Sequence, residues 1–245
     1  MIKLASLAVL IALWALAASF STPRLVPGPL PVFFAFLDEL RHGDLLLHFS
    51  ATLARVASAF TLAMVLGIVI GYAMGRSRVI DKAGDPALIL LLNLPALVVI
   101  ILAYVWVGLT ETAAIAAVTL NKLPNVVVTM REGARALDRS LDEMGAVFRF
   151  SRWKALRHIV LPQLTPYVAA SARSGLSIVW KIVLVVELLG RPNGVGFALN
   201  TYFQLFDVAH ILAYALSFVA VMLVIENFLV QPLERHANRW RPRPA

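Results

Sequence analysis

The sequence predicts an all-α membrane protein, and its composition and the lengths of its apolar runs carry that prediction. Of its 245 residues, 60% are hydrophobic and only 15% are charged, whereas a soluble domain has about 45–50% apolar and about 25% charged residues. The apolar residues form long unbroken runs close to the ~20 residues that a helix needs to cross a bilayer. Soluble single-core enzymes and disordered proteins are therefore poor interpretations.

Six apolar windows are predicted to cross the membrane. They cover residues 4–20, 56–74, 86–108, 112–130, 166–189 and 209–230. The remaining segments are too short and scattered to form a second globular domain. We therefore expect a single transmembrane domain over residues 1–245, with six transmembrane helices.

The basic residues predict how these helices are oriented, because Lys and Arg concentrate in cytoplasmic connections. With six crossings and a cytoplasmic start, fifteen of the 22 Lys and Arg residues lie in inside segments and three lie outside, namely Arg24, Arg41 and Arg191. The inside set includes Arg235, Arg239, Arg241 and Arg243 of the tail. Both termini are therefore expected in the cytoplasm. Orientation explains most of the net charge of +8, and no nucleic-acid partner is expected.

Glycine and proline mark special positions in and between the predicted spans. Gly67, Gly71 and Gly75 are spaced four apart in span two, so they share a helix face and predict close packing against a neighbouring helix. Pro95 and Pro124 each remove a backbone hydrogen bond and predict kinks in spans three and four. Residues 32–41, after a proline-rich connection, are expected to form a short amphipathic helix at the outer interface.

The longest inside connection, residues 131–162, is too long for a simple turn between two helices. Its first half has an apolar pattern with helical spacing, and a second short helix is expected to begin after Ser151, a good N-cap residue. Pro162 is expected to end that helix. Two amphipathic helices on the inside predict a docking element for a cytoplasmic partner.

The docking segment resembles the cytoplasmic signature of permeases in bacterial ABC importers: Glu-Ala-Ala, three residues, Gly, nine residues, Ile-x-Leu-Pro. Glu143, Ile159, Leu161 and Pro162 match in register. Gly145 replaces the second Ala, and Arg149 stands where the family has Gly. That last departure calls the turn geometry into question, because left-handed backbone favours glycine. The resemblance covers most of the chain, and Leu53-x-Arg55-Val56 and Glu187–Gly190 are similar to the nitrate, taurine and alkanesulfonate subfamily.

This resemblance implies a type I importer fold and the other subunits of a transporter. It implies a homodimer of this permease in the bacterial inner membrane, two cytoplasmic ABC ATPase subunits, and an extracytoplasmic solute-binding protein. ATP and Mg²⁺ would bind the ATPase, and no cofactor is expected in this chain, which has no Gly-x-x-x-x-Gly-Lys-Ser/Thr motif. The expected ATPase-docking residues are Glu143, Gly145, Arg149, Ser151, Arg152, Trp153, Leu161 and Pro162.

Polar residues inside the spans are the candidates for a translocation pathway, because ionisable groups at mid-membrane tend to face a bundle interior or a cavity. The set comprises Asn121, Lys122, Asn125, Trp180, Lys181, Glu187 and Arg55. Three interpretations of the two lysines remain open. Either lysine could pair with Glu187 or another carboxylate, both could line an anion pathway, or their head groups could reach the membrane surface. For Arg55, interfacial anchoring competes with a role in the pathway.

Other functional classes fit less well. The five histidines lack metal-ligand spacing with a carboxylate, and cysteine is absent, so we expect no catalytic residue, no metal site and no enzyme. A subunit of a channel or of a secondary transporter is the alternative function, but neither needs a charged docking segment. The two intramembrane lysines argue against a pure scaffold. We therefore predict the permease of an ATP-driven importer for a small anion such as a sulfonate, taurine or nitrate.

Overall fold

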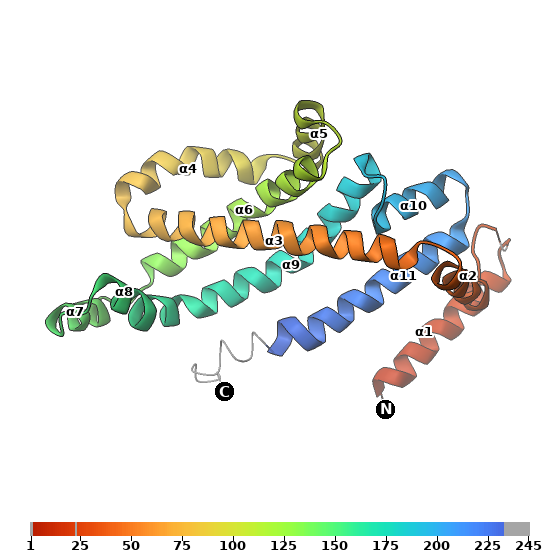
Figure 1. The fold of residues 1–245 in the computed structure, drawn as a ribbon. Coiled ribbons are helices and arrows are strands. Elements are labelled where there is room, and N and C mark those ends of the chain that lie inside the picture. The colour runs from red at the N-terminus through yellow and green to blue at the C-terminus, as the bar shows by residue number, and fades with distance from the viewer. Residues whose placement is uncertain (1, 23, 233–245) are drawn as a thin grey trace. The chain divides into compact units, whose positions relative to one another are not determined.

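The computed structural model describes residues 2–22 and 24–232, and these residues form helices and connections without any strand (Figure 1). The all-α prediction is confirmed for this described part. The tail arginines 235, 239, 241 and 243 lie outside it.

The chain divides into two compact units, and each is described by itself. The first unit comprises Met1–Ala54 and Leu184–Val224, and the second comprises Arg55–Val183 and Ile225–Ala245. Two long helices, α3 (Leu45–Arg76) and α9 (Leu161–Gly190), contribute residues to both units.

The first unit contains α1 (Ile2–Ser19), α2 (Pro29–Arg41), α10 (Val195–Gln204) and α11 (Val208–Ile225, whose last residue belongs to the second unit). Proline in the first turn of α2 suits a position that needs no N–H partner. Val32 and Ala35 of α2 are buried with Ala213 of α11. The buried Glu39 of α2 accepts hydrogen bonds from Tyr202 and, at 2.8 Å, from Tyr214. Helix α2 is thus fixed to α10 and α11 by apolar and polar contacts.

The second unit contains α4 (Arg78–Asn93), α5 (Ala96–Val107), α6 (Glu111–Arg135), α7 (Arg139–Val147) and α8 (Arg152–Ala155), with π-helical turns η1 (Leu156–Val160) and η2 (Glu226–Val230). Helices α4 and α5 pack on α6. A Cβ added to Gly71 would lie 2.6 Å from the Val127 carbonyl oxygen, and one added to Gly67 or Gly75 would lie 2.5 Å from the Cβ of Val126 or Ala134. The predicted glycine row therefore faces α6 at very short range.

Fewer helices meet simple length and hydropathy criteria for a span than the six predicted windows. Within the described residues, α3, α6 and Val208–Phe228 are long and apolar enough, and α4 with α5 can count as a fourth, broken span. The described apolar part of α1 is the short stretch Ala8–Ser19. Helix α9 has 30 residues but carries Arg173, Lys181 and Glu187 within them.

The kink predicted at Pro95 is confirmed, and it is a full break between two helices. The chain bends by 100° between α4 and α5, at Leu94 and Pro95 (Figure 1). Pro95 cannot donate a backbone hydrogen bond, and the residue before a proline is displaced from helical geometry. Leu94 is accordingly extended, with φ −73° and ψ 126°. Pro124, by contrast, lies inside the unbroken helix α6.

The expectation that Pro162 ends the second docking helix was wrong. The helical chain runs from α8 through η1 directly into α9, with Pro162 in the first turn of α9. The Leu161 N–H donates to the Leu156 carbonyl, five residues back. The hydrogen-bond register therefore changes immediately before the proline, which itself has no N–H to place in that register.

Candidate functional site

The docking segment begins with a well-capped helix. The Asp138 carboxylate accepts hydrogen bonds from the Ser140 backbone N–H at 2.8 Å and the Ser140 hydroxyl at 2.7 Å. These bonds favour the charged form and lower the pKa of Asp138. The Asp138 N–H donates in turn to the Gln163 side chain at 2.9 Å. The start of α7 is thus tied to the start of α9.

Arg149 occupies the turn between α7 and α8 with a left-handed backbone, φ 52°. The Phe150 N–H donates to the Gly145 carbonyl at 2.8 Å, and the Arg149 N–H donates to the Ala146 carbonyl at 3.0 Å. These two bonds define a Schellman motif, whose left-handed position is usually glycine. Arginine therefore keeps the turn that a glycine would make, at a conformational cost of about 1–2 kcal/mol.

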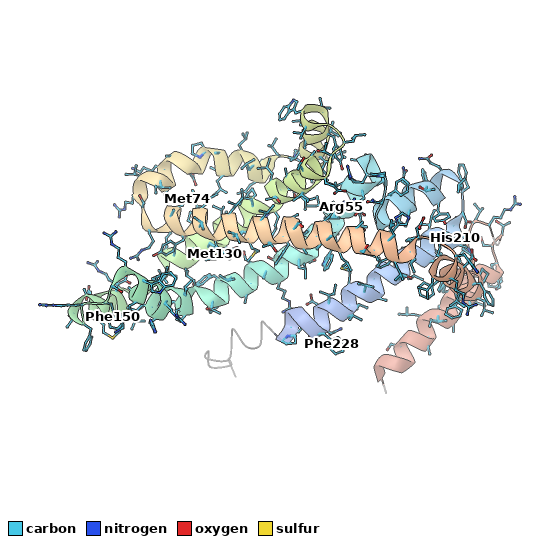
Figure 2. All side chains as sticks on the ribbon, viewed as in Figure 1. Arg55, Met74, Met130, Phe150, His210 and Phe228 are labelled. Carbon is cyan, nitrogen blue, oxygen red and sulfur yellow. The ribbon has the colours of Figure 1, made fainter. Side chains whose placement is uncertain are left out.

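Small and capping residues hold the two docking helices together. Gly145 is buried, and a Cβ added there would lie 2.8 Å from Cδ1 of Ile159. The Ser151 hydroxyl accepts from the Lys154 N–H at 3.3 Å, so Ser151 is the N-cap of α8. The Lys154 ammonium lies 4.2 Å from the ring centroid of Phe150 (labelled in Figure 2). The sequence motif thus places its buried members, Gly145 and Ile159, at the helix–helix contact.

The other docking residues form an exposed surface. Its apolar members include Val147, Phe148 and Trp153, and Trp153 is 69% exposed. Glu143 is exposed beside Arg139, with 3.3 Å between Nε and Oε1. Arg152, Leu161 and Pro162 are exposed as well. Such a mixed apolar and charged surface, with an exposed tryptophan, is typical of a protein–protein contact.

Ion pairs that the sequence analysis did not anticipate join this segment to the spans. Arg76 at the end of α3 donates to Asp142 of α7 at 2.9 Å. On α6, Arg131 donates to Asp85 at 2.6 Å and Arg135 donates to Asp81 at 2.5 Å. Asp81 and Asp85 are four apart on α4, the spacing that could have suggested one acidic helix face.

Lys122 is the most deeply buried cation of the predicted pathway set. Its side chain is 1% exposed, and a Cβ added to Gly175 of α9 would lie 2.5 Å from its Cε and 3.2 Å from its Nζ. No carboxylate among the described residues forms an ion pair with Lys122. Because residue 175 is a glycine, α9 leaves space at this position for the Lys122 side chain.

The remaining pathway candidates on α6 and α9 lie in different surroundings. Lys181 is exposed, although it is only six residues beyond Gly175. Trp180 and Asn121 are half-buried, and Asn125 is exposed. Six residues turn a helix by about 240°, so Lys181 and Gly175 lie on different faces of α9.

Arg55 is paired with a carboxylate that lies just outside the predicted fourth span. Its guanidinium is bidentate to Glu111, with Nε–Oε2 2.9 Å and Nη2–Oε1 2.6 Å. Arg55 is 5% exposed, whereas the Glu111 side chain is 48% exposed. The pair links α3 to the first turn of α6, which Thr110 caps through a 3.1 Å bond from the Ala113 N–H.

Glu187 lies in a hydrogen-bond network within the first unit. Its fully buried carboxylate accepts from the Thr52 hydroxyl and the Gly196 N–H, both at 2.9 Å. The Thr52 hydroxyl also accepts from the Val195 N–H at 2.8 Å, and the His48 ring accepts from the Gly194 N–H at 3.1 Å. Thr52 and His48 were not singled out from the sequence, because nothing local marks them. This network holds the start of α10 on α3 and α9.

Tyr202 and His210 form a second polar cluster in the first unit. Their rings stack with centroids 4.6 Å apart, and His210 contacts Asp207 at 2.8 Å. Burial, together with the hydrogen bond to Glu39, raises the pKa of Tyr202. Its phenol therefore stays protonated and donates to Glu39. Among the described residues, no group of His, Asp and Glu is arranged to hold a metal ion.

Comparison with known proteins assigns the chain to a family. Residues 63–239 match the family model of the binding-protein-dependent transport system inner membrane component. The chain belongs to this family of inner-membrane permeases of ABC importers. It is thus a multi-pass protein of the bacterial inner membrane, as the signature in the docking segment predicted, and the channel or secondary-transporter alternative is disfavoured.

The chain is similar in sequence to individual members of known transport systems over nearly its whole length. A Bacillus subtilis protein that carries the name aliphatic sulfonates transport permease protein SsuC is 28% identical over 96% of this chain and 85% of its own. The taurine transport system permease protein TauC of Escherichia coli is 25% identical over 98% of this chain and 89% of its own. The bicarbonate transport system permease protein CmpB of Synechococcus elongatus is 26% identical over 94% and 86%.

A solved structure shares the fold. The crystal structure of an amino acid ABC transporter with histidines aligns with a TM-score of 0.64 at 20% identity, covering 82% of this chain and 98% of that chain.

Proposed function

We propose that this permease carries a small anion, of the sulfonate, taurine or nitrate kind, and that a separate ATPase drives it through the docking segment. The complete transporter would contain two copies of this chain, two cytoplasmic ATPase subunits that bind ATP and Mg²⁺, and an external solute-binding protein. In this assignment the chain itself catalyses no reaction.

The observation that carries the docking role is the geometry of α7 and α8. The turn at Arg149 is fixed by two hydrogen bonds, and Trp153 and Phe148 remain exposed beside it. Asp142 ties α7 to the end of α3, and Gln163 ties it to α9. A partner that moved α7 would therefore pull on two long helices, as alternating access driven by nucleotide binding requires.

Replacement of the exposed docking residues tests this role. Glu143→Ala with Trp153→Ala is expected to weaken association with the co-expressed ATPase by roughly tenfold or more, because buried tryptophans dominate interface energies. Trp106→Ala is the matched control, since Trp106 is also exposed, on α5. Association and substrate-stimulated ATP hydrolysis are the measurements. Unchanged values in the double variant would remove the docking assignment.

We propose six crossings with both termini in the cytoplasm and a single permease domain over residues 1–245. The excess of basic residues in the predicted inside connections supports this topology. In it, α4 and α5 form one broken crossing, and α1 and α9 cross as well. The broken crossing is compatible with a membrane protein because irregular backbone is tolerated where protein or a water-filled path surrounds it.

Lys122 supports the choice of an anion. A buried cation costs free energy unless an opposite charge compensates it, and none of the described carboxylates pairs with Lys122. We assign the pathway to the predicted set, which is Lys122 with Asn121, Asn125, Trp180, Lys181, Glu187 and Arg55. The names of the taurine, sulfonate and bicarbonate relatives point to the same substrate class.

Transport in proteoliposomes tests the anion pathway. Lys122→Met is expected to lower uptake of taurine, methanesulfonate, nitrate or bicarbonate, whichever the wild type carries, by about tenfold or more, without reducing stability. Arg41→Met serves as the control, because Arg41 is exposed at the end of α2 and belongs neither to the predicted pathway nor to the docking segment. Undiminished uptake by Lys122→Met would take this residue out of the pathway, and uptake without ATP would favour a channel or a secondary transporter.

A further inference from the structure

A basic pocket lies in the second unit where α3 meets α4. It has a volume of about 620 Å³ and is lined by Arg76, Arg78, Lys82 and Arg135, with Asp81 as its one carboxylate and Met74 and Gly75 as its other lining residues. Met74, labelled in Figure 2, marks the end of α3 beside this pocket. Four cations around one carboxylate make a strongly positive cavity.

Two of these four cations are already engaged. Arg76 bonds to Asp142 at 2.9 Å, and Arg135 bonds to Asp81 at 2.5 Å and to Glu132 at 3.0 Å. Arg78 and Lys82 form no ion pair with any of the described carboxylates, and both are exposed. They are four residues apart in the first turns of α4, so they project from the same side of the helix. The positive end of the helix dipole adds to their field.

Apolar side chains are exposed directly beside these cations. Val79 is 78% exposed and Ile80 is 48% exposed, and both lie between Arg78 and Lys82 in the sequence. Further along α4, Ile89 and Leu90 are 52% and 63% exposed. A soluble anion would neutralise the cations but leave this apolar surface in water. A ligand with an anionic head and hydrocarbon tails satisfies both.

We propose that this pocket binds the phosphate of an anionic glycerophospholipid, with Arg78 and Lys82 as the phosphate ligands and the apolar face of α4 along the acyl chains. The pocket itself does not depend on the transported substrate. The proposed topology places it in the inner leaflet. A lipid head group held there would lie beside the Arg76–Asp142 pair, which joins α3 to the docking helix α7.

Native mass spectrometry of the full-length purified chain, titrated with phosphatidylglycerol or phosphatidylcholine, tests the site. The wild type is expected to bind phosphatidylglycerol more tightly. The double variant Arg78→Gln with Lys82→Gln is expected to lose roughly tenfold or more in phosphatidylglycerol affinity. The control, Arg24→Gln with Arg41→Gln, removes the same charge from exposed residues elsewhere and is expected to keep wild-type affinity.

Three outcomes would overturn the proposal. If the double variant of Arg78 and Lys82 bound phosphatidylglycerol as tightly as the wild type, these two residues would not be the phosphate ligands. Displacement of the lipid by millimolar inorganic phosphate would show that the site takes a free anion. Loss of ATPase association by this variant in lipid-free detergent would show that the two cations contact a protein partner.

Thermal unfolding checks that the double variant is folded. If the double variant does not fold, the single variant Arg78→Gln is used for the same titration and is expected to lose part of the phosphatidylglycerol affinity. Because no step measures transport, failure here leaves the proposed anion pathway untouched.

Discussion

Arg149 illustrates how one residue can keep a turn that its side chain disfavours. The two backbone bonds of the Schellman motif hold it at φ 52°, a conformation that costs a non-glycine residue about 1–2 kcal/mol. Selection for the arginine side chain itself, at the surface that we assign to the ATPase, would explain why the residue is not glycine.

Arg149→Gly is therefore expected to stabilise the folded chain by about 1 kcal/mol and to weaken ATPase association, because it removes a surface cation. Thermal unfolding and a binding titration measure the two effects. Phe206→Gly is the control, since Phe206 also has a positive φ of 55° but lies between α10 and α11 in the sequence, outside the docking segment. Association that stays at the wild-type level in Arg149→Gly would show that the arginine side chain has no part in docking.

The Arg55–Glu111 pair is asymmetric, because the guanidinium is buried and the carboxylate is half-exposed. Glu111→Ala leaves the buried charge without this carboxylate and is expected to cost about 3 kcal/mol. Arg55→Met keeps the volume and leaves a carboxylate that water can reach, so its cost is expected to be smaller. Unfolding free energies of both variants and of the double variant measure the difference, and equal costs would contradict the argument.

At the scale of helices, the glycine row of α3 decides how closely α3 and α6 approach. Gly71→Ala would bring a Cβ to 2.6 Å from a backbone oxygen of α6, and backbone cannot move aside as a side chain can. We expect a loss of about 1–3 kcal/mol in the unfolding free energy, measured in detergent.

Gly84→Ala provides the contrast for that measurement. The nearest atom to its added Cβ is the terminal methyl of Met74 at 3.2 Å, which can shift. Since alanine favours helix over glycine by about 1 kcal/mol, this variant is expected to be neutral or stabilising. A Gly71→Ala variant as stable as Gly84→Ala would mean that α3 and α6 are not held at this distance.

At the scale of the whole molecule, topology is the property that decides where each surface acts. The chain contains no cysteine, so single cysteines can report sidedness without background. With Gln204→Cys outside and Arg139→Cys inside, a membrane-impermeant thiol reagent is expected to label the first in intact cells and the second only after permeabilisation. Both positions are exposed. The reverse pattern would place the docking segment outside and contradict both the proposed topology and the proposed docking role.

Much of the molecule could be predicted without coordinates. Helical class, the docking segment and the family signature follow from local composition and spacing. The amphipathic helix expected at 32–41 is α2, and the N-cap expected at Ser151 is present. Such features depend on residues close together in the chain, so sequence patterns report them directly.

Contacts between distant residues required the tertiary structure. Glu111 pairs with Arg55 from 56 residues away, and Thr52 reaches Glu187 across 135. Nothing in the sequence around Lys122 indicates that its side chain would lie against Gly175. The uninterrupted helix through Pro162 was likewise decided by hydrogen-bond register, whereas the bend at Leu94 follows from Pro95, which the sequence marks. The sequence by itself determined which segments are helical and apolar, because those are local properties. Only the packing of the helices decided which charges are paired, and that Lys122 is buried with no carboxylate of the described residues beside it, because that depends on groups far apart in the chain.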